Sequence, residues 1–238
     1  TTVCHLHGGI DLNQPEQRAI CDGCGACADI CPRHAKKRMI VKKEASEIVE
    51  EVKRHRLFYR QSGGGITFSG GEATLQREFL DELTEQLYDL GFHLALETSG
   101  YFDLDAVRTI LQRMDMIFMD LKHMDPVKHQ YFTGVDNRRI LENMKRLSEI
   151  DAEIVIRIPV IGGVNADAEN ISKSATFVHC YLPQAKMELL PYHRFGFGKY
   201  EALGLEMPSN QFFTPSDDEM AEFKQMVKNA GVELVDFR

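Results

Sequence analysis

Apolar residues along the chain follow two patterns that alternate with each other. Stripes with a spacing of three to four residues predict amphipathic helices, and they cover residues 48–52, 79–90, 104–114, 140–150 and 171–178, with a sixth helix starting at 214–217. Short apolar runs of strand length lie between them, at residues 65–69, 93–97, 116–120, 154–158, 187–190 and 232–237. Strands that alternate with helices imply parallel pairing through right-handed crossovers. The pattern therefore predicts an α/β fold.

Several single residues refine this prediction. Ser46 and Asp103 precede apolar stripes and are expected to be helix N-caps, whereas Gly91 follows a stripe and should end it. Pro215 is expected in the first turn of the last helix. Cys180 lies just after the fifth stripe and is expected to behave as a small buried hydrophobic residue.

Polar or glycine-rich residues follow almost every expected strand. They are Ser69-Gly70-Gly71-Glu72, Glu97-Thr98-Ser99-Gly100, Asp120-Leu121-Lys122, Arg157 and Pro191-Tyr192-His193. A solvated strand end explains any one of them. Because the carboxyl ends of parallel strands open on one face of a barrel, where active sites are built, five in succession predict a single functional rim.

The composition narrows the class of protein. The 238 residues are 43% hydrophobic and 27% charged, with a formal net charge of −8. An acidic balance argues against a broad nucleic-acid surface, and no apolar run approaches the length of a membrane helix. Without a secretory signal the chain is expected to be cytoplasmic. The sequence opens on Thr1 instead of Met, so a truncated start is also expected.

Five of the six cysteines lie near the start of the chain. Cys21-Asp-Gly-Cys24-Gly-Ala-Cys27-Ala-Asp-Ile-Cys31-Pro32 has the C-x-x-C-x-x-C-x-x-x-C-P spacing of a bacterial ferredoxin. Gly23 and Gly25 allow the backbone to curl so that the thiolates converge on one cluster. The alternative is a zinc knuckle, although zinc sites usually use two well-separated C-x-x-C pairs.

The fourth ligand of this cluster is expected from outside the run. In two-cluster ferredoxins the last cysteine of each run binds the other cluster. Cys4 stands where the last cysteine of a preceding run would be, so Cys4, Cys21, Cys24 and Cys27 form the expected ligand set. Cys31 would then bind a second cluster whose other ligands are missing.

The motifs along the chain resemble those of the glycyl-radical-enzyme activating enzymes, the radical S-adenosylmethionine (SAM) proteins typified by the activators of pyruvate formate-lyase. The resemblance covers nearly the whole chain in the right order. It rests on Ser62-Gly63-Gly64-Gly65-Ile66-Thr67-Phe68-Ser69-Gly70-Gly71-Glu72-Ala73-Thr74, Glu97-Thr98-Ser99-Gly100, Met119-Asp120-Leu121-Lys122, Thr133-Gly134-Val135-Asp136-Asn137, Ile156-Arg157-Ile158-Pro159 and Leu189-Leu190-Pro191-Tyr192-His193. A ferredoxin-type insertion is typical of one large subgroup.

The resemblance implies a role for residues at the first two strand ends. Gly70, Gly71 and Glu72 are similar to the motif that receives the amino group of SAM, since glycines allow close backbone approach and a carboxylate can pair with an ammonium. Glu97 matches a position that the family fills with Asp or Glu near the same group, with Thr98 beside it. The resemblance also allows a bound monovalent cation there.

The later strand ends match the rest of the cofactor site. Lys122 and Arg157 are similar to the basic residues that hold the carboxylate side of SAM. His193 resembles the residue that contacts the ribose and adenine. Taken alone, each of these has the alternative interpretation of an ordinary surface residue.

One departure from the family pattern is clear. The family binds its reactive 4Fe-4S cluster with C-x-x-x-C-x-x-C after the first strand, and the 238 residues contain no such motif. The expectation is therefore a partial (β/α)6 TIM-type open barrel that lacks its first strand, over residues 45–238, preceded by an incomplete ferredoxin-like 4Fe-4S module over residues 1–44. The reactive cluster would lie upstream of Thr1, no catalytic residue would lie in this chain, and the chain alone would be inactive.

The intact enzyme is expected to cleave SAM reductively and to install a glycyl radical on a partner enzyme, with a flavodoxin or ferredoxin as electron donor. Two alternatives remain. One is a non-catalytic electron-transfer or regulatory protein that keeps a ferredoxin module on a dead barrel. The other is a radical enzyme that acts on a small molecule.

Overall fold

The computed structural model describes residues 14–18, 20–38, 40–203, 205–206 and 211–237, so Cys4 lies outside the described residues. Contacts within the chain divide it into two compact units. One unit comprises residues 1–43 and 194–209, and the other comprises residues 44–193 and 210–238. The larger unit contains five of the six strands that the apolar runs predict.

The larger unit is built on a parallel five-stranded sheet whose strands lie side by side in chain order. The strands are β1 (Ile66–Phe68), β2 (Leu94–Thr98), β3 (Met116–Asp120), β4 (Glu153–Val160) and β5 (Lys186–Pro191). Each strand pairs in parallel with the next. This arrangement confirms the α/β fold and matches an open, partial barrel.

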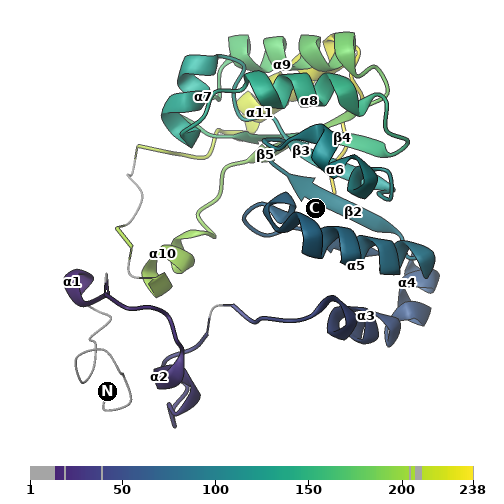
Figure 1. Cartoon of the computed structure of the whole chain (residues 1–238). Coiled ribbons are helices and arrows are strands. Elements are labelled where there is room, and N and C mark those ends of the chain that lie inside the picture. The colour runs from purple at the N-terminus through teal and green to yellow at the C-terminus, as the bar shows by residue number, and fades with distance from the viewer. Residues whose placement is uncertain (1–13, 19, 39, 204, 207–210, 238) are drawn as a thin grey trace. The chain divides into compact units, whose positions relative to one another are not determined.

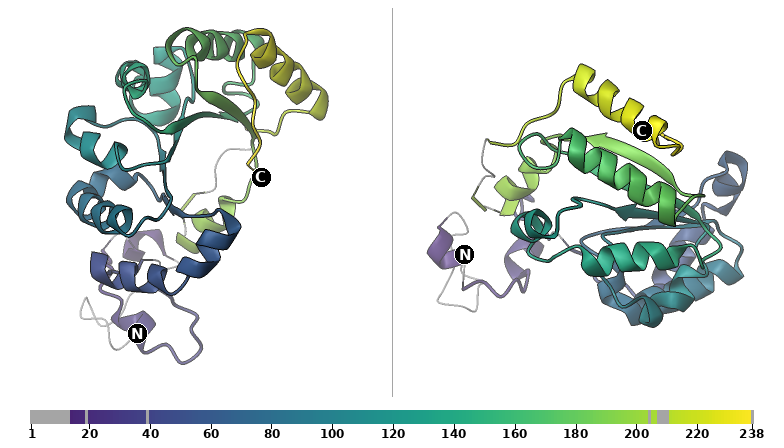
Figure 2. Two further views of the ribbon diagram at one scale, coloured as in Figure 1. Left: turned by 90° about the vertical axis from the view of Figure 1, so that its right-hand side faces the viewer. Right: turned by 90° about the horizontal axis from the view of Figure 1, so that it is seen from above.

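Helices lie on one side of the sheet (Figures 1 and 2), and those between β1 and β5 connect its strands. They are α3 (Ala45–Lys53), α4 (Arg56–Ser62), the 3-10 helix η1 (Ala73–Gln76), α5 (Arg77–Asp89), α6 (Leu104–Leu111), α7 (Pro126–Thr133), α8 (Arg138–Leu147), α9 (Ala168–Tyr181) and α11 (Asp217–Asn229). Asp103 caps α6 as predicted, because its carboxylate accepts from the N–H groups of Asp105 and Ala106. Gly91 ends the α5 segment with φ 71°.

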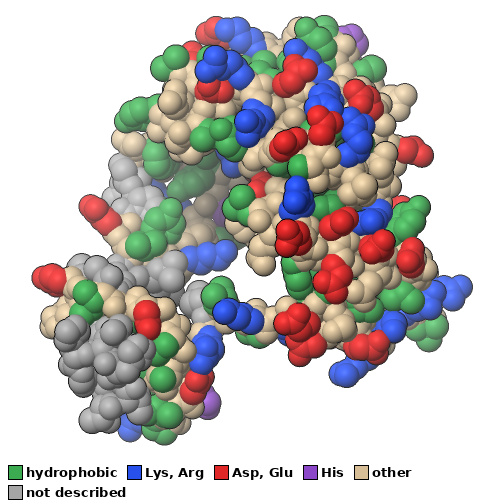
Figure 3. Space-filling view, in the orientation of Figure 1, with side chains coloured by type: hydrophobic (Ala, Val, Ile, Leu, Met, Phe, Trp, Pro, Cys, Tyr) green, Lys and Arg blue, Asp and Glu red, His purple; other side chains and the backbone are tan. Residues whose placement is uncertain are grey.

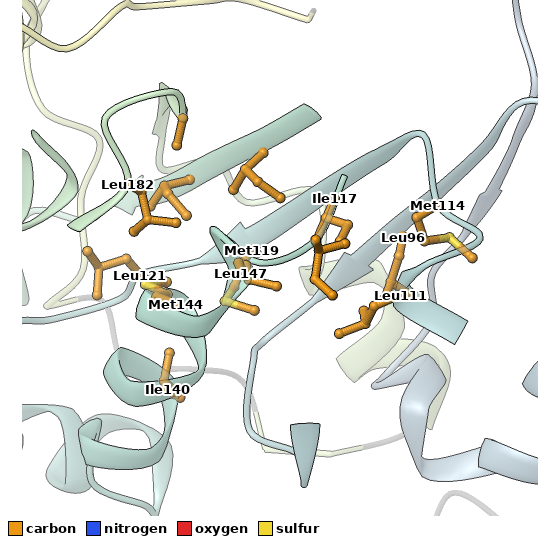
Figure 4. Packing of buried hydrophobic residues seen from close by; sticks show 14 of the residues in the cluster. Leu96, Leu111, Met114, Ile117, Met119, Leu121, Ile140, Met144, Leu147 and Leu182 are labelled. Atoms are coloured by element: carbon orange, nitrogen blue, oxygen red, sulfur yellow. The ribbon is translucent and has the colours of Figure 1, made fainter. Parts of the chain in front are cut away.

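Alternation along each strand gives the sheet two different faces. One row of side chains, such as Leu96, Ile117 and Met119, is fully buried against the helices (Figure 4). Burial of each such side chain contributes about 1.5–3 kcal/mol. The opposite face carries a smaller apolar cluster made of Ala95, Phe118 and Val155. On the same face, charged side chains lie next to this small cluster, nearer the carboxyl ends of the strands.

Two expectations about helix ends and one about burial were wrong. The N-cap of α3 is Glu44, which forms a capping box with Glu47, whereas Ser46 lies inside the helix. Ser216 caps α11, so Pro215 precedes the helix instead of lying in its first turn. Cys180 is exposed, because the buried face of α9 is formed by other positions.

Two further differences concern whole elements. Helices α4 and α7 carry no strong apolar stripe, and the sequence pattern did not predict them. The expected strand over residues 232–237 contributes only an isolated parallel bridge between Met187 and Leu234. Its backbone still follows β5, since the N–H of Val235 donates to the carbonyl of Met187 at 3.0 Å.

The smaller unit contains the short helices α1 (Pro15–Arg18), α2 (Ala26–Asp29) and α10 (Phe197–Leu203). Gly23 and Gly25 adopt left-handed φ values of 70° and 81°, so glycine provides the curled backbone that the cysteine run requires. Arg38 pairs with Asp29 across this loop, with 2.9 Å between Nε and Oδ1. The pair ties the segment after the cysteine run to α2.

Acidic and basic side chains intermingle over the face of the larger unit seen in Figure 3. Among the described residues, no helix has both the length and the apolar composition that crossing a membrane requires.

Candidate functional site

Charged side chains from three adjacent strands lie at one level of the sheet. The register pairs Asp120 of β3 with Arg157 of β4, and Arg157 with Glu188 of β5. Arg157 was expected to close its strand, but β4 continues to Val160. Its place opposite the last residue of β3 explains how it still reaches the rim. These residues and Glu97 of β2 form what we call the rim cluster: Glu97, Asp120, Arg157 and Glu188.

Arg157 is the centre of the rim cluster. Its Nη1 donates to Glu97 Oε1 at 2.6 Å, and its Nε donates to Glu188 Oε2 at 2.7 Å. Only 16% of the Arg157 side chain is exposed, and Glu188 is almost fully buried at 1%. The guanidinium also stacks on the ring of Phe118, with Cζ 3.7 Å from the ring centroid. One cation is therefore held by two carboxylates and an aromatic face.

Glu97 extends this network to the loop after β1. The hydroxyl of Ser69 donates to Glu97 Oε2 at 2.8 Å, while Arg157 occupies the other oxygen. Partial burial favours the neutral acid, but the hydrogen bonds from Ser69 and Arg157 outweigh it and hold the pKa of Glu97 below its usual range. Glu97 is therefore an anion that faces both the β1 loop and β4.

Glu72 forms a second cluster at the neighbouring strand ends. Its carboxylate accepts from the Ser99 N–H at 2.9 Å, the Ser99 hydroxyl at 2.6 Å and the Thr98 hydroxyl at 2.9 Å. The Thr74 hydroxyl donates as well, at 2.9 Å. Burial opposes ionisation, yet these hydrogen bonds lower the pKa of Glu72. Since a carboxylate offers about four acceptor sites, the protein itself nearly saturates this group.

The two glycines before Glu72 leave their side of the turn open. Gly70 has a left-handed φ of 135°, and a Cβ added at Gly70 or Gly71 would meet no atom within 4 Å. Space above this backbone is therefore available to a ligand. The open turn lies between Ser69, which contacts Glu97, and Glu72, which contacts Thr98.

Asp120 and Lys122 form an ion pair at the end of β3, with 3.4 Å between Nζ and Oδ2. Burial raises the pKa of Asp120 despite the nearby Lys122 and Arg157. His193 is exposed and lies just after the end of β5. The structure thus joins Glu72 with Thr98, and Glu97 with Arg157, by direct contacts. It places Lys122 just after the carboxyl end of β3 and His193 just after that of β5, with β4 between these two strands.

The cysteines of the ferredoxin-like run lie in the smaller unit. Cys21 and Cys24 are exposed, whereas Cys27 and Cys31 are partly buried. Backbone N–H groups, led by that of Lys36, lower the pKa of the Cys31 thiol. Within the described ranges, no three His, Cys, Asp or Glu side chains gather closely enough to hold a metal. Cluster binding by this run therefore stays a prediction.

Sequence reasoning missed Glu188 and Phe118 as members of the rim. Glu188 is a charged residue inside the apolar run Met187-Glu188-Leu189-Leu190, and an interrupted buried strand was the available signal. Phe118 gave no signal, because an aromatic residue in a buried strand is ordinary.

Comparison with known proteins agrees with this geometry. The profile of the Radical SAM superfamily matches residues 20–175. The 4-hydroxyphenylacetate decarboxylase activating enzyme of Clostridioides difficile (strain CD196) is 35% identical over 97% of this chain and 76% of its own length. The isethionate sulfite-lyase activating enzyme of Desulfovibrio desulfuricans is 35% identical over 88% of this chain and 69% of its own length.

A solved structure leads to the same family. A domain of pyruvate-formate lyase-activating enzyme from Bacteroides vulgatus superposes with a TM-score of 0.61 at 33% identity, covering 72% of this chain and 98% of that one. Enzymes of this kind use SAM and a 4Fe-4S cluster to install a glycyl radical on a partner enzyme. The chain therefore belongs to the glycyl-radical-enzyme activating enzymes of the radical SAM superfamily.

Proposed function

We propose that SAM binds on the carboxyl-end rim between the open Gly70-Gly71 turn and the rim cluster. The observation that carries this proposal is the network in which Arg157 joins Glu97 and Glu188 beside that turn. SAM carries an ammonium, a carboxylate and a sulfonium, so its site needs charges of both signs close together. Anionic Glu72 and Glu97 and cationic Lys122 and Arg157 supply them.

The Gly70-Gly71 turn takes the amino group of SAM in this proposal. Because Thr74, Thr98 and Ser99 already occupy the carboxylate of Glu72, an ammonium there meets the backbone carbonyls of the open glycines first. The negative charge of Glu72 attracts the ammonium from behind the turn, and Thr98 acts by holding Glu72.

The carboxylate of SAM lies towards Lys122 and Arg157, which bind it by charge-assisted hydrogen bonds. His193 contacts the ribose and adenine at the end of β5. We also propose a monovalent cation beside Glu97, whose carboxylate would supply a negatively charged oxygen ligand. These residues orient the cofactor and exclude water from it.

The residues of this chain do not provide the ligands of the reactive 4Fe-4S cluster. It would supply the electron that cleaves SAM, but the chain has no C-x-x-x-C-x-x-C motif, and the described cysteines do not converge. The residues of this chain therefore do not fit that cluster.

For the ferredoxin-like run we propose a different cluster. Cys4, Cys21, Cys24 and Cys27 would hold one 4Fe-4S cubane, and Cys31 would bind a second. Anaerobic reconstitution followed by iron analysis tests this assignment. Loss of about four irons in C4A but not in C31A supports the crossed ligand set. The reverse pattern contradicts it.

The partner is a glycyl radical enzyme, and the electron donor we propose is a flavodoxin or ferredoxin. Reduced thiols at Cys21 to Cys31 suit a cytoplasmic setting. Relatives at the same 35% identity are named for 4-hydroxyphenylacetate decarboxylase, trans-4-hydroxy-L-proline dehydratase and isethionate sulfite-lyase. Overall identity does not choose among these three classes of partner.

The test combines the full natural protein that contains these residues with SAM, a reductant and each of the three partner classes under anaerobic conditions. Electron paramagnetic resonance detects a glycyl radical, and chromatography detects deoxyadenosine. A radical on one partner class, reduced in K122A and retained in K173A, supports the proposal. Lys173 is a matched control, because it pairs with Glu169 on the exposed face of α9. Deoxyadenosine without a radical on any partner favours a small-molecule substrate.

A further inference from the structure

The backbone over residues 233–237 runs beside β5 without forming a regular strand. The N–H of Met187 donates to the carbonyl of Glu233 at 2.8 Å, and the N–H of Val235 donates to the carbonyl of Met187 at 3.0 Å. These bonds hold the segment parallel to β5. They carry its last described residue, Phe237, towards the level of the rim cluster.

Phe237 makes two contacts there, and neither is needed to pair the segment with β5. Its N–H donates to Glu188 Oε1 at 2.8 Å. Its ring packs edge-to-face on Phe118, with 5.3 Å between ring centroids and an interplanar angle of 87°. Both partners also contact Arg157. Glu188 hydrogen-bonds it from β5, and Phe118 stacks against it from β3.

These contacts form a closed circuit of four residues, to which Phe237 contributes both its backbone N–H and its ring. Glu188 Oε2 accepts from Arg157 Nε at 2.7 Å, and the guanidinium lies over Phe118 at 3.7 Å. Glu188 and Phe118 both contact Phe237, the first through its backbone N–H and the second through its ring. A closed circuit restricts each member, so the guanidinium of Arg157 has one orientation in which every bond is satisfied.

We propose that Glu188 and Phe237 are positioning residues that aim Arg157 at the carboxylate of SAM. Nε and Nη1 of Arg157 are committed to Glu188 and Glu97. Nη2 has no hydrogen-bond partner among the residues that the structure describes, and it is the nitrogen that meets the ligand. The proposal rests on the proposed SAM site and adds the side chains that hold its arginine in place.

A purely structural role for the circuit predicts a different result from a positioning role. A misaimed Arg157 weakens only the contact with the SAM carboxylate. General loosening of the sheet weakens every contact with the ligand. Decarboxylated SAM separates the two, because it keeps the amine, sulfonium, ribose and adenine but has no carboxylate.

The experiment measures binding of SAM and of decarboxylated SAM to the purified chain by isothermal titration calorimetry. The variants are R157A, E188Q and F237A, with F237Y as the conservative replacement. E153Q is the matched control, because Glu153 pairs with Lys186 at 2.7 Å across the same two strands but on their far ends. Circular dichroism establishes that each variant is folded.

In E188Q, an amide N–H of the new side chain faces Arg157 Nε–H or Phe237 N–H, so one donor loses its acceptor. We expect SAM binding to weaken about tenfold in E188Q and by a smaller factor in F237A. Binding of decarboxylated SAM should stay within about twofold of wild type. F237Y and E153Q should bind both ligands as the wild type does.

Equal losses for both ligands in E188Q and F237A overturn the positioning role, and so does unchanged SAM binding in both. If E188Q does not fold, F237A and F237Y decide the question, since 46% of Phe237 is exposed and its replacement should disturb the core little. Failure of R157A to affect SAM binding overturns the proposed function instead, because Arg157 would then not contact the ligand.

Discussion

The hydroxyl of Thr98 donates to both oxygens of the Glu72 carboxylate, at 2.9 and 3.0 Å. This contact joins the loop after β1 to the last residue of β2. It fixes the Gly70-Gly71 turn relative to the strand that carries Glu97. A turn with two glycines would otherwise sample many conformations, and the contact selects one of them.

Replacing Glu72 tests the value of this contact. In E72Q an amide nitrogen faces the donors of Ser99 or Thr98, so we expect a loss of about 1–3 kcal/mol in the free energy of unfolding at pH 7. The pKa of Glu72 is lowered in the folded state, so its contribution is present above the unfolded pKa and is lost as pH falls below about 4.3. Denaturant unfolding of both proteins at neutral and acid pH measures the difference. A difference of the same size at both pH values contradicts the assignment.

Asp120 should behave in the opposite way. Burial raises its pKa, so the stability it contributes is present at low pH and is lost as pH rises through the folded pKa. We expect D120N to raise the free energy of unfolding at pH 7 by less than about 1 kcal/mol, because 35% of the side chain is exposed and water screens the charge. The gain should vanish at acid pH. Lower stability of D120N at neutral pH would show that the pair with Lys122 outweighs burial.

Gly100 provides a test of the turn after β2. Its φ is 77°, and an added Cβ would lie 2.8 Å from the sulfur of the buried Met119. G100A should therefore lower the free energy of unfolding by about 1–3 kcal/mol. Gly91 is the matched control, since its φ is 71° but a Cβ there meets open space. Thermal unfolding should show a larger loss for G100A than for G91A, and equal losses would mean that Met119 yields at no cost.

The apolar pattern was sufficient to predict the sheet. The β3 run is apolar with polar neighbours, and its limits at Met116 and Asp120 were predicted without error. The expected strand over residues 232–237 was wrong, because an apolar run specifies burial but not how many ladder bonds form. Helix α7 was missed, because its apolar residues do not share one face.

The site was predictable where a residue's chemistry was unusual for its place. Polar strand ends indicated Glu72, Glu97 and Lys122, while the level of Arg157 depended on strand register. Register depends on how neighbouring strands pack against each other. The pattern within one strand does not show which residue of the next strand lies opposite it. The partners of Arg157 on β5 and in the segment 233–237 could not be predicted for the same reason.

Equilibrium binding of radiolabelled SAM to the wild-type chain, K122A and K173A tests whether the carboxyl-end rim is the SAM site. If SAM binds there, K122A removes a charge-assisted contact with the ligand carboxylate. We predict saturable binding by the wild type and K173A, and a loss of about tenfold in K122A. Equal affinity in K122A and K173A, or no saturable binding by the wild-type chain, would contradict the account.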